Sequence, residues 1–241
     1  ALKDEGIVHT VARHTSAALE NAAASSPARL MQHTFDLGRV ERIPELAERI
    51  LGSDGAGAAG GAEAGAQSTS NETVLINNAG MLEPIGPASD LSPADLAAHI
   101  SVNLTALMQL TAKVLALTDR AARAGEASRT VVSIGSGAAR RPYAGWAPYC
   151  STKAAVEMFT RVLAAEHAEE PGFRAVTVAP GVVDTEMQAL IRKTDESRFP
   201  DRPKFIELKE SGKLYTTEYA AELVMRAVFD PEIESGESVD V

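Results

Sequence analysis

Short β-branched runs alternate with helix-patterned segments along this chain, and no other feature narrows its possible folds as much. The runs expected to form strands cover residues 7–12, 31–35, 73–77, 130–134, 174–179 and 238–241. The helical patterns between them cover residues 39–51, 95–118, 151–169 and 218–229. Such alternation is typical of βαβ units around a parallel sheet. The sequence therefore predicts an α/β fold, and its 241 residues suit one large domain over residues 1–241.

The composition disfavours several kinds of partner. A formal net charge of −10 argues against binding to nucleic acid or to an anionic membrane surface. The chain has no run of eighteen or more apolar residues, so no transmembrane span is expected. Cys150 is the single cysteine and cannot form an internal disulfide, and the first six residues lack the apolar core of a signal peptide. We therefore expect a cytoplasmic protein that acts on a small molecule and has no metal site.

Residues 52–70 are almost entirely glycine, alanine and small polar residues. Such a segment cannot bury enough apolar surface to offset the entropy lost when it becomes ordered. We interpret it as a flexible surface insertion between a helix and a strand. A lid or a docking segment is the alternative interpretation.

A tyrosine and a lysine four positions apart, Tyr149 and Lys153, stand at the start of the predicted helix after the strand at 130–134. Residues at this spacing share one helix face, and an ammonium so close is expected to lower the tyrosine pKa from about 10. A phenol tuned in this way can give a proton to a carbonyl oxygen or take one from an alcohol. Ser136, thirteen positions before the tyrosine, would lie at the carboxyl end of that strand, where open α/β sheets bind ligands. These side chains predict a proton-transfer site for interconverting carbonyls and alcohols.

Other interpretations of these residues stay open. A tyrosine–lysine pair alone is more often part of a solvated helix face. The strand before Ser136 and the apolar helix after Lys153 favour a proton-transfer site instead. Cys150 adjoins the tyrosine and could be a nucleophile. Because no histidine lies within thirteen residues on either side, we interpret Cys150 as a packing residue.

The order of these motifs resembles the short-chain dehydrogenase/reductase family. The matching features are NNAG at residues 77–80, Ser136, the Tyr149–Lys153 pair and PGVVDT at residues 180–185. Asn103 matches the helix asparagine that, in this family, holds a water against the lysine. The resemblance implies a Rossmann-type doubly wound parallel sheet with helices on both faces and a nicotinamide cofactor. The catalytic residues that it implies are Ser136, Tyr149, Lys153 and Asn103.

The same resemblance assigns the cofactor contacts. Arg13 stands where a basic residue accepts the 2′-phosphate of NADP, so NADP(H) is the expected cofactor, although Arg13 could simply be an exposed arginine. Asp36 and Leu37 match the pair that lies against the adenine, and Thr185 matches the residue that holds the nicotinamide carboxamide. The complete set of expected cofactor contacts is Arg13, Asp36, Leu37, Asn77, Ala79, Gly80, Tyr149, Lys153, Pro180, Gly181, Val183 and Thr185.

Within the family, the chain is most similar to the sepiapterin reductase branch, through GWAPYC at residues 145–150, DTEMQ at 184–188 and SGESVD at 235–240. In that branch Asp240 would anchor the flat N–H edge of a pterin through two charge-assisted hydrogen bonds. Asp240 could also be a frayed terminus, and Trp146 and Met187 could equally belong to the core. The substrate contacts that the resemblance implies are Ser136, Trp146, Tyr149, Gly181, Met187, Gln188 and Asp240.

One feature of the family is missing from this sequence. The family begins with a strand, a glycine-rich TGxxxGxG turn and a helix whose N-terminus holds the pyrophosphate, and nothing here supplies them. We therefore expect the first strand and the first helix to be absent, with residues 1–6 as the tail of that helix. An amino-terminal segment outside this sequence and a true truncation are both open.

The resemblance thus implies an NADPH-dependent carbonyl reductase that reduces a ketone or vicinal diketone to the alcohol, with sepiapterin as the leading candidate substrate. It also implies a homodimer formed through the helices at 95–118 and 151–169. One alternative is a benzil-type aromatic diketone reductase with no role in pterin chemistry. Another is a non-catalytic dinucleotide-binding scaffold, although a scaffold has no need of the complete set Ser136, Tyr149 and Lys153.

Overall fold

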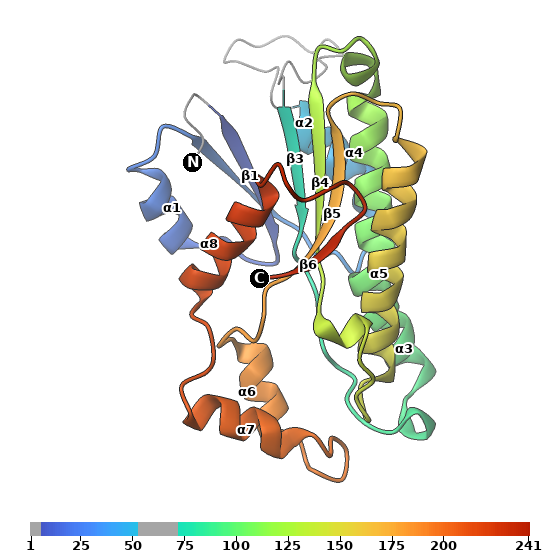
Figure 1. Cartoon of the computed structure of the whole chain (residues 1–241), viewed down its shortest axis with the longest axis vertical. Coiled ribbons are helices and arrows are strands. Elements are labelled where there is room, and N and C mark those ends of the chain that lie inside the picture. Colours follow the sequence, from blue (N-terminus) through green and yellow to red (C-terminus); the bar gives the residue numbers. More distant parts are fainter. Residues whose placement is uncertain (1–5, 53–71) are drawn as a thin grey trace.

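The computed structural model describes residues 6–52 and 72–241, in which parallel strands are flanked by helices (Figure 1). The strands are β1 (Ile7–Ala12), β2 (Arg29–Thr34), β3 (Glu72–Asn77), β4 (Ser128–Ile134), β5 (Phe173–Ala179) and β6 (Ser238–Asp240). The α-helices are α1 (Ala17–Ala23), α2 (Ile43–Gly52), α3 (Pro93–Ile100), α4 (Ala106–Arg123), α5 (Ala147–Glu166), α6 (Glu186–Lys193), α7 (Arg202–Glu210) and α8 (Thr217–Val228). β1 has the expected bounds and the other expected elements are present with shifted ends, whereas α1, α6 and α7 have no counterpart among the expected elements. Of the predicted insertion, Gly52 closes α2 and the rest lies outside the described residues.

The predicted parallel α/β architecture is confirmed, but its strands are divided between two sheets. β1 pairs with β2, and the second sheet has the order β3-β4-β5-β6, with every pair parallel. The family resemblance implies a single sheet. Among the described residues, no strand lies between β1 of the first sheet and β3 of the second. The two sheets are therefore not joined by a ladder of hydrogen bonds.

Helices cover both faces of the four-stranded sheet because its central strands are apolar on both sides. Val132 and Val176 pack in a cluster with residues of α8. Val131 and Ala175, which point to the opposite face, pack with residues of α4 and α5. Successive residues of a strand alternate between faces, so the neighbours Val131 and Val132 belong to different layers. Figure 1 shows α4 and α5 along one side of this sheet and α8 on the other.

The helix expected over residues 95–118 is interrupted near its middle. It begins as predicted, with Ser92 as N-cap and Pro93 in the first turn. After α3, Ser101–Thr105 forms a π-helical segment, and the Ala106 N–H donates to the Ser101 carbonyl five residues back. Single π turns inside α-helices occur frequently at functional sites. Asn103, the residue that the family resemblance selects, lies in this segment and is buried.

The helical stretch Pro93–Arg123 is long and apolar enough to cross a bilayer by length and composition, a test that core helices also pass. The sequence, in contrast, predicts no segment of this kind, because the chain has no run of eighteen apolar residues. Its α4 part packs against α2 through Leu46, Leu110 and Val114, and against β4 and α5 through Leu115. These contacts are those of a core helix.

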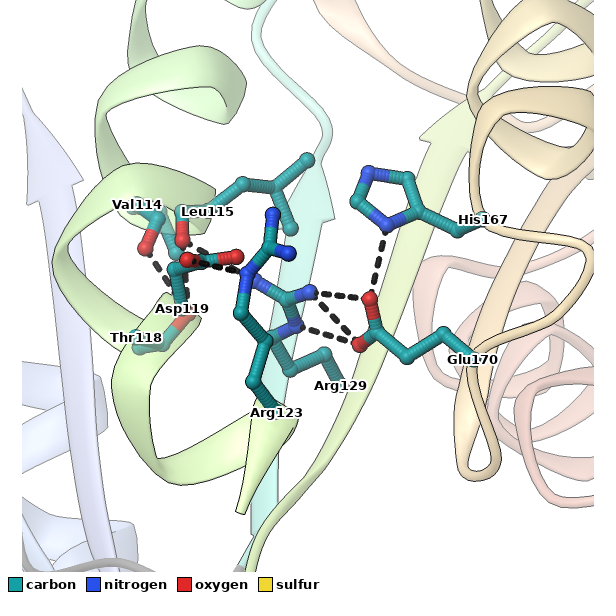
Figure 2. Close-up of polar contacts among 8 residues, drawn as sticks. All are labelled: Val114, Leu115, Thr118, Asp119, Arg123, Arg129, His167 and Glu170. Atoms are coloured by element: carbon teal, nitrogen blue, oxygen red, sulfur yellow. Dashed lines mark hydrogen bonds and ion pairs between the residues drawn. The ribbon is translucent and has the colours of Figure 1, made fainter. Parts of the chain in front are cut away.

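A buried ion pair holds β4 against the chain that follows α5 (Figure 2). The Arg129 guanidinium, which is 2% exposed, donates to both carboxylate oxygens of Glu170, with a shortest distance of 2.5 Å. It also donates to the Leu115 carbonyl at 2.9 Å, while His167 Nδ1 lies 2.8 Å from Glu170. Burial alone would raise the pKa of the Glu170 carboxyl, but hydrogen bonds from Arg129 and His167 outweigh burial and hold it below its ordinary value.

Candidate active site

The carboxyl ends of β3, β4 and β5 meet at one edge of the sheet and bring the predicted motifs together. Asn77 is the last residue of β3, Ser136 follows β4 by two residues, and Pro180 directly follows β5. From α5, Lys153 Nζ reaches the same edge and donates to the Ile134 carbonyl at 2.7 Å. Parallel strands present their carboxyl ends together, which is why segments far apart in the sequence converge here.

Tyr149 lies in the first turn of α5 and is 8% exposed. Burial raises the pKa of its phenol above the ordinary value of 10, a hydrogen bond with Ser136 offsets part of that rise, and Cys150 adds to it. The expectation that Lys153 would lower this pKa is therefore wrong. Desolvation of the phenolate dominates because the ring is enclosed, and the phenol is protonated at neutral pH.

Lys153 is buried beside this ring. Its Nζ lies 5.7 Å from the centroid of the Tyr149 ring. Burial lowers the pKa of the Lys153 ammonium to about 8, because the amine has lost its surrounding water. The hydrogen bond to the Ile134 carbonyl replaces only part of that hydration. At neutral pH the site therefore contains a neutral phenol next to a mostly protonated amine, which is the pair needed to donate a proton.

Asn103 is held in one orientation beside Lys153. Its Oδ1 accepts the Met81 N–H at 2.8 Å, and its Nδ2 donates to the Met81 carbonyl at 2.7 Å and to His99 Nε2 at 2.9 Å. A Cβ added to Gly80 would stand 3.7 Å from Asn103 Oδ1 and 3.9 Å from Lys153 Nζ. The NNAG segment therefore lies directly against Asn103 and Lys153. Because Gly80 has no side chain, the space beside these two residues stays open.

The predicted cofactor contacts of β1, β2 and β3 lie in different environments. Arg13 is exposed immediately after β1. Asp36 follows β2, and its carboxylate accepts the Gly38 N–H at 2.9 Å. Asn77 is buried and donates to Thr111 Oγ1 at 3.0 Å, which ties β3 to α4. Of the NNAG segment, Ala79 and Gly80 are exposed at the edge. Leu37 packs against the cluster beneath α2 and α4.

The turn after β5 can accept only glycine at its second position. Gly181 has φ +73°, and a Cβ there would approach the Tyr215 ring to 2.8 Å. Val183 forms an isolated parallel bridge with Tyr215. Thr185 is the N-cap of α6, yet its side chain makes no capping hydrogen bond, so its hydroxyl is available to a ligand. The turn is thus anchored by Tyr215 while its polar end stays exposed.

An aromatic cluster borders Tyr149. Trp146 stacks on Phe199 with ring centroids 4.5 Å apart and meets Tyr149 edge-on at 5.7 Å. From α6, Met187 packs against the same cluster. Trp146 Nε1 and Gln188 Oε1 are both buried, and neither has a hydrogen-bond partner among the described residues. Such groups are costly to leave unpaired, and both of these predicted substrate contacts lie buried rather than open at the surface.

Asp240 is the last residue of β6 and pairs in register with Ala179, so it is not frayed. Its carboxylate is 2.5 Å from Arg140 Nη2, and both side chains are exposed. The Arg140 guanidinium also lies 3.6 Å from the buried carboxylate of Glu157. The carboxylate that the resemblance assigns to a pterin therefore already has a cationic partner.

Two features of the site lie outside the sequence-based predictions. One is His99, which is fully buried behind Asn103 and had no distinguishing neighbours in the sequence. The other is α6, although the spacing of Met187, Leu190 and Ile191 is that of one helix face and could have indicated it. A cavity of about 430 Å³ opens between α6, α3 and the segment after β3; it is lined by Met81, Glu83, Pro84, Ile85, Asp95, Ala98, Leu190, Thr194 and Arg198.

Comparisons with known proteins agree with this geometry. A model of the short chain dehydrogenase family matches residues 63–196. The chain is 32% identical to a benzil reductase ((S)-benzoin forming) of Bacillus cereus over 241 residues, which are 100% of this chain and 91% of that protein. It is 38% identical to a sepiapterin reductase of Bos taurus over 171 residues, which are 69% of this chain and 61% of that protein. The crystal structure of the KRED1-Pglu enzyme matches with a TM-score of 0.73 at 28% identity, over 96% of this chain and 88% of that one.

Proposed function

This chain belongs to the short-chain dehydrogenase/reductase family, and we propose that it is an NADPH-dependent reductase that converts one carbonyl of an aromatic vicinal diketone to an alcohol. The observation that carries the proposal is the buried, protonated phenol of Tyr149, which lies beside Lys153 and whose raised pKa is partly offset by Ser136. An acid of this kind matches the proton that a reduced carbonyl oxygen must receive.

The residues at the sheet edge fit a nicotinamide dinucleotide. Gly80 lacks the side chain that would fill the space against Asn103 and Lys153. The Thr185 hydroxyl is free of a capping bond and could hold a carboxamide. Arg13 is exposed and free to accept a 2′-phosphate, which supports NADP over NAD. Asp36, which follows the end of β2, is the residue that the family resemblance assigns to the adenine.

The proposed mechanism assigns one task to each side chain. A reduced nicotinamide bound at this edge would supply the hydride that the carbonyl carbon receives. Ser136 donates a hydrogen bond to the carbonyl oxygen, and Tyr149 transfers its phenolic proton to that oxygen as negative charge develops there. The Lys153 ammonium stabilises the phenolate left on Tyr149, and Asn103 holds the backbone beside Lys153. Fixing these groups on strand ends and on one helix supplies the alignment that proton transfer requires.

Two observations favour an aromatic diketone over a pterin. Trp146 meets Tyr149 edge-on, and Ile85 and Leu190 pack in the same cluster, so aromatic and aliphatic side chains surround the proposed proton donor. The Asp240 carboxylate, which a pterin would need, is paired with Arg140. NADPH oxidation by the purified protein with benzil, and separately with sepiapterin, tests the assignment. Turnover of benzil supports it, whereas turnover of sepiapterin alone, or of neither ketone, would overturn it.

The alkaline side of the pH profile should report Lys153. Because burial lowers the pKa of Lys153 to about 8, kcat/KM for reduction should be constant near pH 7 and fall above pH 8 as the ammonium deprotonates. On the acid side both the phenol and the ammonium keep their protons, so neither causes a loss. Initial rates of NADPH oxidation between pH 6 and about 10 give the profile. A kcat/KM that stays constant through that range would contradict the role of Lys153.

Replacing Asp240 by alanine should separate the two substrate classes. If Asp240 serves only its ion pair with Arg140, kcat/KM for benzil and sepiapterin should each change by less than about twofold, since an exposed pair contributes little. Arg140→Ala, which removes the same pair and leaves the carboxylate, is the matched control. A selective rise in KM for sepiapterin in D240A alone would show that Asp240 binds the pterin edge and would favour the pterin assignment.

We also propose that the protein is a homodimer that uses the outer faces of α3, α4 and α5. Ile100, Met108, Met158 and Val162 are large apolar side chains exposed on these helices. Exposed apolar groups gathered on neighbouring helices are typical of an interface between subunits. Light scattering coupled to size-exclusion chromatography tests the proposal. A twofold mass is expected, reduced to that of a monomer by Met158→Glu.

A further inference from the structure

We propose that His99 is a positioning residue of the active site, whose neutral imidazole holds the Asn103 amide against the segment after β3 and so keeps Lys153 and Tyr149 aligned for proton transfer. The inference rests on the proposed reductase function and extends it to a residue outside the Ser136, Tyr149 and Lys153 set.

The contacts of the imidazole determine its tautomer. His99 is fully buried, and its Nδ1 lies 2.7 Å from the Glu83 carbonyl oxygen. A carbonyl can only accept, so Nδ1 carries the hydrogen. In the neutral ring Nε2 is then an acceptor, and it receives a hydrogen bond from Asn103 Nδ2 at 2.9 Å. Thr152 Oγ1, between Tyr149 and Lys153 on α5, lies 3.1 Å from the same nitrogen.

The Asn103 amide has no second arrangement that satisfies its partners. Both of its amide hydrogens are used, one by the Met81 carbonyl and one by His99, and its oxygen accepts the Met81 N–H. Rotating the amide by half a turn would set its oxygen against a carbonyl oxygen and an imidazole lone pair. His99 and the Met81 backbone together fix which way the Asn103 amide points, and Asn103 lies against Gly80 beside Lys153.

The surroundings of His99 favour the neutral ring. Burial lowers the pKa of His99 below its ordinary value of 6.5, and the positive charge of Lys153 lowers it further, while hydrogen bonds to the backbone oxygens of Glu83 and Pro148 act in the opposite direction. The ring also meets Tyr149 edge-on, with centroids 6.4 Å apart. His99 thus touches three parts of the site: the segment after β3, the π-helical segment and α5.

A double-mutant cycle on kcat tests the proposal. His99→Phe keeps the ring volume and removes both hydrogen bonds; we expect it to lower kcat for benzil by about tenfold to a hundredfold, with KM for NADPH changed by less than about threefold. His99→Gln can still donate to Glu83 and accept from Asn103, and should keep kcat within about threefold of the parent. In an Asn103→Ala background, H99F should cost less than about twofold more.

Other outcomes would overturn the proposal. A full loss from H99F in the N103A background would show that His99 acts independently of Asn103. A loss in H99Q as large as in H99F would show that its hydrogen bonds do not matter. Nitrogen-15 NMR of the histidines in the parent protein decides the tautomer without turnover and without a variant that must fold. A hydrogen on Nε2 of His99 would exclude the proposed geometry, whereas an inactive protein with the hydrogen on Nδ1 would overturn only the proposed reaction.

Discussion

Replacing Tyr149 by phenylalanine is expected to lower kcat for carbonyl reduction by about a thousandfold, because it removes the buried, protonated phenol that is proposed to give its proton to the carbonyl oxygen. The substitution removes one hydroxyl and keeps the ring that packs edge-on against Trp146. Stability and NADPH affinity should therefore change little. Single-turnover NADPH oxidation measures the chemical step, and quenching of protein fluorescence by NADPH measures binding.

Tyr143→Phe is the matched control for this experiment. Tyr143 packs against Trp146 in the same aromatic cluster, with centroids 4.8 Å apart, and its hydroxyl lies 3.4 Å from Lys204 Nζ. Removing that hydroxyl should change kcat by less than about twofold, since this contact is long and partly exposed. Equal losses in Y143F and Y149F, or a Y149F variant that retains most of its kcat, would contradict the assignment of Tyr149 as the proton donor.

Replacing Glu170 by alanine is expected to destabilise the protein by about 3 kcal/mol, because it leaves the Arg129 guanidinium buried without its counter-ion. Arg129 is 2% exposed, whereas Glu170 is 17% exposed, which places the effect at the lower end for buried pairs. For a chain of this length the loss corresponds to a fall in Tm of about 6–12 °C. Thermal unfolding monitored by circular dichroism measures it.

A second ion pair in the same region supplies the control (Figure 2). Arg123 and Asp119 are 2.6 Å apart on α4, but their side chains are 76% and 38% exposed. Asp119→Ala should cost less than about 1 kcal/mol, since water replaces the lost partner. If E170A is as mild as D119A, the buried pair does not stabilise the fold.

The contribution of Glu170 should also depend on pH. Because the folded-state pKa of Glu170 lies below its ordinary value of 4.5, its stabilising effect is fully present above pH 4.5 and is lost as the pH falls through the folded-state pKa. The difference in Tm between the parent protein and E170A should therefore shrink in acid. A difference that is constant down to pH 3 would contradict a role for the charged carboxylate.

Much of the fold and of the site follows from local patterns in the sequence. Lys153 lies one helical turn after Tyr149, and Ser136 follows a strand whose carboxyl end must open at the ligand-binding edge. The apolar runs on both faces of β4 and β5 require helices on both sides of the sheet. These features depend on residues close together in the chain, so periodicity and turn chemistry are enough to predict them.

The predictions that failed or were absent concern electrostatic environment and distant contacts. The pKa of Tyr149 is raised rather than lowered because its ring is enclosed by residues from α5 and from the chain around Phe199, and sequence spacing carries no measure of burial. The separation of the strands into two sheets depends on which edges meet, which no single strand reveals.

The sequence by itself determined the α/β order of elements, the proposed catalytic set of Ser136, Tyr149 and Lys153, and the edge of the sheet at which that set lies. Only the tertiary structure decided the partners of His99 and Asp240. His99 can position Asn103 only because folding places it between Glu83 and Asn103. Asp240 forms its ion pair with Arg140, which lies 100 residues away in the chain. Polar groups take their chemistry from whichever charges and dipoles surround them after folding, and for these two residues most of those groups come from distant parts of the chain.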